Sequence, residues 1–164
     1  MRWIWIDKFI EFQPGERAVA VKNVSRAEDH LHDLYPAYPI MPASLIIEGM
    51  AQTAGILVGQ ARSFNERVIL AKIKNASLDG YAVPGDQLTY EATLEHIDDS
   101  GATTAGRVLR NGQPFGEVDI IFSHIDRQGG VELGIPEHNF VFGKDFKNLL
   151  VSHYNIDLSN YPDD

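Results

Sequence analysis

One segment constrains the fold more than any other: residues 43 to about 60 or 62 predict a helix that is apolar on almost every side. Its large apolar residues leave no continuous polar face: Leu45, Ile46, Ile47, Met50, Ile56, Leu57 and Val58. A helix that is hydrophobic all round has to be buried all round. The rest of the chain must therefore supply a layer that wraps around it.

The helix is preceded by a stiff connection. Pro36, Pro39 and Pro42 recur at every third position. Proline restricts its own backbone and that of the residue before it, so residues 34–41 are predicted to be an extended loop. Pro42 also suits the first turn of a helix, because its missing N–H has no partner there in any case.

Most of the remaining sequence has β-character. A hairpin is predicted within residues 4–24, with its turn at Gln13–Glu16, and the turn signal Asn111–Gly112 predicts a second one. After the helix, the predicted strands are 68–78, 88–97, 103–109 and 115–125. One buried helix followed by antiparallel strands predicts an α+β architecture, with the sheet wrapped around the helix.

Composition narrows the classes of function. The 164 residues carry a net charge of −9, which disfavours a nucleic-acid-binding or anionic-membrane-binding protein. The chain has no cysteine, which excludes disulfides and thiolate metal sites. Residues 1–7 reach a charge too soon for a signal peptide, and the apolar run at 45–58 is too short to span a membrane. We expect a soluble, cytoplasmic protein.

The domain boundary is expected near residue 126. Residues 1–126 hold all the predicted strands, and Gly129–Gly130 lies just beyond them. The C-terminal extension, residues 127–164, is predicted to hold one short helix near 144–153 and to be partly packed, because it is too apolar for a free tail. Its last residues, 160–164, are expected to be disordered.

Three polar residues lie along one face of the apolar helix and form a polar line. Ser44, Glu48 and Gln52 are spaced four residues apart and therefore share one face. Burial favours the protonated form of a carboxyl group, which suits a general acid. The unpaired N–H groups at Ala43 and Ser44 suit a carbonyl oxygen or an anion. The alternative is that the polar line simply meets solvent or a structural polar network.

Two motifs resemble a known family. Residues 34–52 read L-Y-P-A-Y-P-I-M-P-A-S-L-I-I-E-G-M-A-Q. They resemble the signature of 3-hydroxyacyl-acyl-carrier-protein dehydratases, roughly H-F-P-G-H-P-x-M-P-G-V-L-x-x-E-A-x-A-Q. Residues 83–88, V-P-G-D-Q-L, resemble a second block of that family. The resemblance covers about residues 5–126 and implies the hotdog fold, a long helix wrapped by an antiparallel sheet, with two sheets joined in a dimer.

The resemblance also implies a reaction. The family removes water from a 3-hydroxyacyl thioester, which gives a trans-2-enoyl thioester without a cofactor. A histidine takes the Cα proton, and a helix carboxylate from the other subunit helps to protonate the leaving hydroxyl. Glu48 matches this carboxylate. The implied substrate-binding positions are Leu34, Tyr38, Met41, Ala43, Ser44 and Gln52.

The family's histidine is absent, because its position holds Leu34, and the next histidine position holds Tyr38. His32 is the candidate replacement base. On an extended chain it shares a face with residue 34, at a distance of about 6.5–7 Å. His30 is about twice as far along the chain. Both histidines can alternatively be solvated loop residues.

Three functions therefore remain open: a dehydratase of the fatty acid synthesis type that uses Glu48 and His32, a non-catalytic acyl-thioester-binding protein, and a thioesterase in which Glu48 activates water. The expected partner is an acyl carrier protein or coenzyme A thioester. Local cations for a carrier protein are Arg62, Arg67, Lys72 and Lys74. A homodimer is expected, and a trimer of dimers stays open. The six histidines show no metal-ligand spacing, so no metal is expected.

Overall fold

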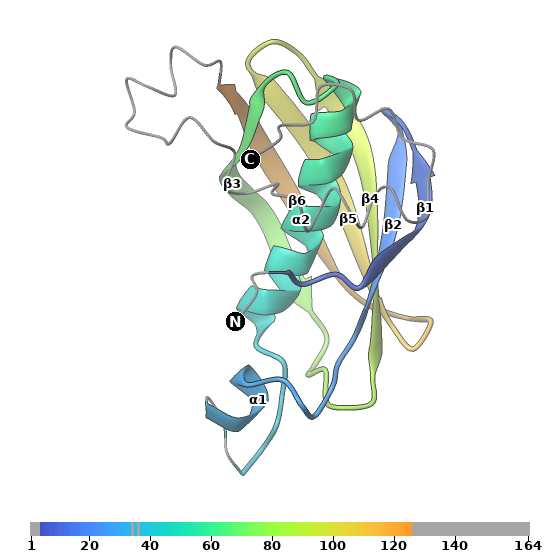
Figure 1. The fold of residues 1–164 in the computed structure, drawn as a ribbon, viewed down its shortest axis with the longest axis vertical. Helices are drawn as coiled ribbons and strands as arrows, with labels where there is room; N and C mark the ends of the chain where they lie inside the picture. The colour runs from blue at the N-terminus through green and yellow to red at the C-terminus, as the bar shows by residue number, and fades with distance from the viewer. Residues whose placement is uncertain (1–3, 34, 36, 126–164) are drawn as a thin grey trace.

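The computed structural model describes residues 4–33, 35 and 37–125. A six-stranded antiparallel sheet curves around one long helix (Figure 1). The elements are β1 (Lys8–Gln13), β2 (Arg17–Asn23), α1 (His30–Asp33), α2 (Ala43–Ala61), β3 (Arg67–Leu78), β4 (Gln87–Ile97), β5 (Gly101–Arg110) and β6 (Gln113–Ile125).

The strand order is β1-β2-β4-β5-β6-β3, so β1 and β3 form the two edges of the sheet. Figure 1 shows α2 lying across one face, with the strands bending around it. The helix contacts β2, β3, β4, β5 and β6. Met50, Ile56 and Leu57 on α2 are fully buried in one core with Leu88 and Tyr90 of β4. This arrangement confirms the predicted α+β class and the predicted burial of the helix.

The predicted elements agree closely with the observed ones. The helix expected from residue 43 to 60 or 62 ends at Ala61, and the strands differ from the predicted bounds by at most two residues. The N-terminal hairpin is also present, and its turn contains Gly15 with a φ of 72°. That left-handed conformation is accessible to glycine at little cost.

One short helix was not predicted. α1 lies in the polar stretch before the proline-rich loop. Its first turn forms because the backbone N–H groups of Leu31 and His32 donate to the carbonyls of Glu28 and Asp29, at 3.1 and 3.0 Å. Leu31 is 1% exposed and anchors the turn to the core. A single buried leucine among polar residues is too weak a pattern to predict such a turn.

Several sequence predictions lie outside the described residues. They are the C-terminal extension 127–164, its short helix near 144–153, the disorder at 160–164 and the conformation at Leu34. The domain boundary near residue 126 therefore stays a prediction. None of the helices in the described ranges combines the length and apolar character needed to cross a membrane.

The helix and the sheet approach each other closely at a glycine of α2. A Cβ atom added at Gly49 would lie 2.5 Å from Cζ and 2.6 Å from Oη of Tyr90, which is fully buried on β4. At Gly59 the nearest atoms, on the Phe64 ring, would be 3.0 Å away. The close approach at Gly49 fixes the height of α2 above the sheet, and Glu48 is its neighbour in the chain.

We expect Gly49→Ala to destabilise the protein by about 1–3 kcal/mol through overpacking, despite alanine's better helix propensity. Urea unfolding followed by circular dichroism measures this change. Gly59→Ala is the matched control on the same helix, and its cost should be smaller because the Cβ contact is longer. An equal or larger loss in Gly59→Ala would contradict this account of the contact at Tyr90.

Candidate functional site

The N-terminus of α2 is open. Met41 is 1% exposed and is tied to the loop before β4, since its backbone N–H donates to the Ala82 carbonyl at 2.8 Å. Pro42 is the N-cap residue and makes no side-chain capping bond. Ala43 and Ser44 are exposed, and the first N–H groups of a helix have no partner within it. This end therefore offers two N–H groups to a carbonyl oxygen.

Two residues of the predicted polar line, Glu48 and Gln52, are joined by a hydrogen bond. The Gln52 side chain is buried in α2 and donates from Nε2 to Oε1 of Glu48 at 3.0 Å. Glu48 is half-buried, one turn beyond Ser44. The structure thus brings Glu48 and Gln52 together near the helix N-terminus, while Ser44 lies exposed at its start.

A third residue joins this pair and was missed in the sequence. The backbone N–H of Trp5 donates to Oε1 of Gln52 at 2.8 Å. Trp5 is 4% exposed, and its ring packs edge-on against His30 with centroids 5.1 Å apart. A hydrogen bond from a backbone N–H does not depend on the type of the residue, so no sequence pattern could have indicated this contact.

The two candidate histidines have different environments. His32 is exposed, and its Nε2 lies 2.8 Å from the Arg26 carbonyl oxygen, within its own segment. The His30 side chain is 9% exposed, and its Nε2 lies 3.7 Å from Oε2 of Glu28. Burial lowers the pKa of His30 below its usual value, against the opposing effect of Glu28. His32 is thus engaged within its own segment, and its expected pairing with a Glu48 of the other subunit stays a prediction.

The tyrosine of the proline-rich loop faces outwards. Tyr38 is 57% exposed, and its ring packs at 90° against that of Tyr81, with centroids 6.1 Å apart. The two exposed rings form an aromatic surface beside the loop that leads into α2. This placement suits contact with a ligand or partner at the mouth of the site more than a role in the protein core.

A buried ionic group lies beneath α1. Lys22 is 7% exposed, forms a close ion pair with Glu28 and lies 3.4 Å from Asp7. Burial raises the pKa of Tyr90 well above its usual value, and the negative charges of Asp7 and Glu28 add to that shift. Since a buried lysine needs such partners, this group ties the segment just before α1 to β2 and to the segment that carries Trp5.

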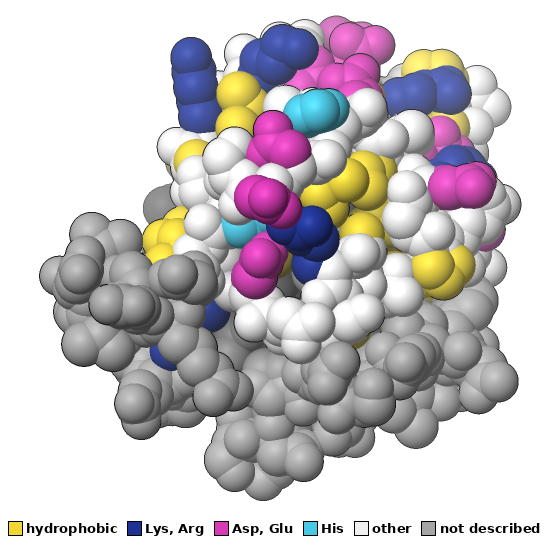
Figure 2. Space-filling model, turned by 90° about the horizontal axis from the view of Figure 1, so that it is seen from above, with side chains coloured by type: hydrophobic (Ala, Val, Ile, Leu, Met, Phe, Trp, Pro, Cys, Tyr) yellow, Lys and Arg dark blue, Asp and Glu magenta, His cyan; other side chains and the backbone are white. Residues whose placement is uncertain are grey.

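The predicted cations for a carrier protein separate into two groups. Arg62 is engaged with Glu66 at 3.3 Å and with Asp99 at 2.6 Å. Figure 2, which looks down on the end of the molecule where α2 finishes, shows acidic and basic side chains side by side there. Lys72 and Lys74 instead lie exposed on the edge strand β3. They stay candidates for contact with an acidic partner.

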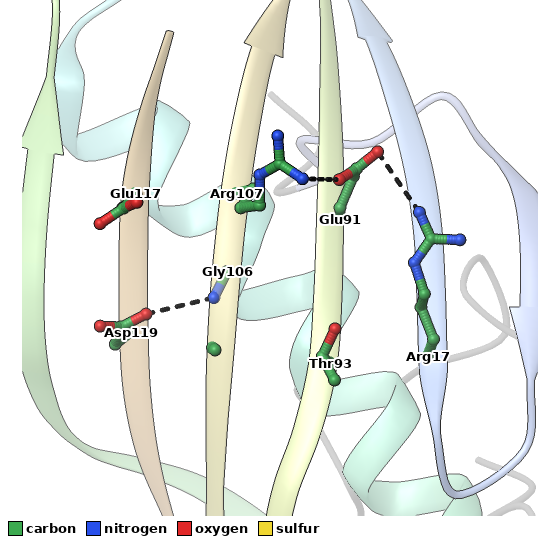
Figure 3. Close-up of a pocket in the computed structure, with 8 residues that line it drawn as sticks. Arg17, Glu91, Thr93, Gly106, Arg107, Glu117 and Asp119 are labelled. Atoms are coloured by element: carbon green, nitrogen blue, oxygen red, sulfur yellow. Dashed lines mark hydrogen bonds and ion pairs between the residues drawn. The ribbon is translucent and has the colours of Figure 1, made fainter. Parts of the chain in front are cut away.

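A separate hollow of about 440 Å³ lies on the sheet face turned away from α2 (Figure 3). Arg17 and Arg107 both reach Glu91 there, at 3.3 and 3.6 Å, and Asp119 accepts a bond from the Gly106 N–H. Its charged groups largely pair with one another. Among the described residues, no group of three or more histidine, aspartate or glutamate side chains is placed to hold a metal.

Comparison with solved structures shows that the chain has the hotdog fold. It is similar to the dehydratase heterocomplex ApeI:P from Xenorhabdus doucetiae, with a TM-score of 0.65, 15% identity, and coverage of 80% of this chain and 89% of that one. It is also similar to a hypothetical thioesterase protein with coenzyme A from Streptococcus pneumoniae, with a TM-score of 0.58, 10% identity, and coverage of 73% and 85%.

Sequence comparison shows the family. A sequence model of the FabA-like domain matches residues 3–115, and the chain belongs to that family. A 3-hydroxyacyl-[acyl-carrier-protein] dehydratase FabZ from Ruminiclostridium cellulolyticum is 41% identical over 56% of this chain and 66% of its own length. The FabZ protein of Listeria monocytogenes is 30% identical over 76% of this chain and 87% of its own. The resemblance predicted from the two motifs is thereby confirmed.

The environment of His30 predicts a pH dependence of stability. Because its pKa is lowered in the folded state, the unfolded chain binds more protons at mildly acidic pH, and stability falls as the pH drops through about 6.5. We expect His30→Phe to lessen this fall, because a phenyl ring keeps the packing on Trp5 and does not titrate. Urea unfolding at pH 7.5 and 5.5 compares the two proteins. An identical pH dependence in both would contradict the assignment to His30.

Proposed function

We propose that this protein acts on fatty acyl thioesters as a dehydratase, converting a 3-hydroxyacyl thioester to a trans-2-enoyl thioester. The observation that carries this proposal is the half-buried Glu48, bonded to Gln52 one turn inside an open helix N-terminus, in a chain of the FabA-like family. The FabZ relatives are named as dehydratases of acyl-carrier-protein substrates.

Each part of the site has a role in this reaction. The N–H groups at Ala43 and Ser44 bind the thioester carbonyl oxygen and stabilise the negative charge that develops there when Cα loses its proton. Glu48 gives a proton to the 3-hydroxyl group as the C–O bond breaks, so the hydroxyl leaves as water. In the reverse direction, Glu48 takes that proton back from the attacking water.

The base that takes the Cα proton is His32 in this proposal. Leu34, which stands at the family's histidine position, cannot accept a proton. His32 would first have to leave the Arg26 carbonyl, to which its Nε2 lies at 2.8 Å. His32 is exposed, whereas Leu31 beside it is buried in the core, so the rearrangement has to move the His32 side chain while Leu31 stays anchored. The thioester is presented by an acyl carrier protein or by coenzyme A, and a cytoplasmic location stays a prediction.

A thioesterase is the second candidate. The observation that favours it is the engagement of His32 with the Arg26 carbonyl, while Glu48 lies one turn inside the open helix end. A carboxylate can activate water for attack on a thioester without a histidine. One hotdog neighbour is named a hypothetical thioesterase protein. Fold alone does not separate these activities.

Hydration of a trans-2-enoyl thioester, followed by loss of the enoyl absorbance, tests the proposal. We expect turnover in the wild type and a loss of at least about 100-fold in both Glu48→Gln and His32→Ala, because each removes one proton-transfer group. His30→Phe is the matched control, since it replaces a neighbouring histidine on the same turn. We expect it to keep the wild-type rate.

The same series separates the alternatives. Turnover that survives His32→Ala would exclude His32 as the base. An inactive wild type together with an active Leu34→His variant would indicate a binding protein that has lost its base. If no variant hydrates the enoyl thioester, and if thioester hydrolysis depends on Glu48, the thioesterase would replace the dehydratase as the proposed function.

We also propose that two copies associate through the β3 edges. β3 pairs only with β6 among the described strands, and Leu70 and Ile73 are 38% and 41% exposed on it. An edge strand with exposed apolar side chains favours addition of another strand.

We expect Ile73→Asp to convert a dimer to a monomer in light scattering. Ile10→Asp, on the opposite edge strand β1, is the control and should keep the wild-type mass, which also reports any trimer of dimers.

A further inference from the structure

Two exposed tyrosines lie at the mouth of the site, Tyr38 on the proline-rich loop and Tyr81 on the loop between β3 and β4. Their rings are perpendicular, with centroids 6.1 Å apart, and each residue is 57% exposed. Two perpendicular rings form a corner, in which a planar aromatic ligand can stack on one ring and place its edge against the other. We refer to these two residues as the tyrosine pair.

The backbone fixes the two loops that carry the tyrosine pair. The Met41 N–H donates to the Ala82 carbonyl at 2.8 Å, and this isolated β-bridge joins the loops to each other. Both residues of the bridge are buried. The loops lie at the end of the molecule where α2 begins (Figure 1), and Ala43 is the first residue of that helix. The tyrosine pair is therefore held beside the open helix N-terminus.

A cation lies beside Tyr81. Arg110, the last residue of β5, donates from Nη1 to the Tyr81 carbonyl oxygen, and its guanidinium carbon lies 4.9 Å from the centroid of the Phe115 ring. A guanidinium group has five N–H donors in a planar fork, so this bond leaves donors for a phosphate group. Two contacts thus hold a positive charge next to the tyrosine pair.

The charges at the mouth do not suit a strongly acidic protein. The two loops, residues 35–44 and 79–86, contain two aspartates and no lysine or arginine. Lys72 and Lys74 lie outside them, on β3. An acidic carrier protein would need a cationic surface across the area that it covers. Coenzyme A needs less, because its adenine ring is uncharged and its phosphate groups can meet one arginine or stay in solvent.

We propose that the tyrosine pair and Arg110 bind the phosphoadenosine end of coenzyme A, and that this contact makes a coenzyme A thioester the preferred substrate. The adenine ring stacks on the tyrosine pair, and Arg110 pairs with a phosphate group. The pantetheine arm leads from there to the N–H group at Ala43, whose Cα lies at most about 18 Å along the chain from that of Tyr38. The substrate preference rests on the proposed function, whereas binding of the nucleotide does not.

NMR titration of the full chain with adenosine 3′,5′-bisphosphate tests the site without any activity. We expect Tyr81→Ala to weaken binding at least about fivefold, because it removes a stacking surface. Tyr81→Phe keeps the ring and should bind within about twofold of the wild type. Tyr35→Ala is the matched control, since it removes another exposed tyrosine of the proline-rich loop that is not in the pair. It should keep the wild-type affinity.

Arg110→Gln separates the phosphate contact from stacking. The glutamine amide can still donate to the Tyr81 carbonyl, but the positive charge is gone. We expect adenosine 3′,5′-bisphosphate to bind at least about fivefold more weakly to this variant, and adenosine, which has no phosphate, to bind as it does to the wild type. The difference between the variant and the wild type should decrease in roughly 0.5 M salt, because the contact is partly exposed to solvent.

Enoyl thioesters that differ only in their carrier test the substrate preference. In the hydration assay we expect the wild type to use enoyl-coenzyme A with a kcat/KM at least about fivefold above that for enoyl-pantetheine, which lacks the nucleotide. In Tyr81→Ala this ratio should approach one. The wild type should also use the acyl-carrier-protein thioester less efficiently than the coenzyme A thioester.

Each outcome bears on a separate part of the inference. Equal binding of adenosine 3′,5′-bisphosphate by Tyr81→Ala and the wild type, or no binding by the wild type, would overturn the nucleotide site. A higher kcat/KM for the carrier-protein thioester would overturn the substrate preference. A wild type that hydrates no thioester would remove the proposed dehydratase function, and the titrations would still decide whether the nucleotide site exists.

Discussion

Burial of α2 on every side is the constraint on which the rest of the structure depends. The helix has its apolar residues all around its axis, so the sheet has to curve across one side and other segments have to cover what remains. The N-terminal segment with Trp5 does part of this covering, and Gln52, at 4% exposure, lies underneath it. Gln52 is therefore enclosed because the helix is enclosed.

Burial strengthens the hydrogen bonds of the polar groups and requires each of them to have a partner. A buried amide needs partners for its oxygen and its nitrogen, and Gln52 finds them in Trp5 and Glu48. The lower effective dielectric near such groups strengthens the bond to the carboxylate. The open N-terminus of α2, with exposed Ala43 and Ser44, stays accessible at one end of the same helix. One element thus presents donors to solvent and holds a carboxylate one turn further in.

Much of the fold could be predicted from the sequence, because hydrophobic periodicity and turn residues are local signals. The helix at 43–61 and the hairpin turn at Asn111–Gly112 follow from the residues that form them. The contact of Gln52 with Trp5 and that of Gly49 with Tyr90 could not be predicted from the sequence. Each joins residues about forty positions or more apart, and the first uses a backbone group. Sequence patterns located Glu48 and Gln52 on one face, but only packing shows which atoms meet.

The composition of the site also bears on why Gln52 is there. An apolar residue of similar size would fill the same space in the core, but the buried Trp5 N–H would lose this acceptor, which costs about 1–3 kcal/mol. The bond to Glu48 contributes less, because Glu48 is half-buried and can turn to water. Stability therefore gives a sufficient reason for an amide oxygen at this position in the helix.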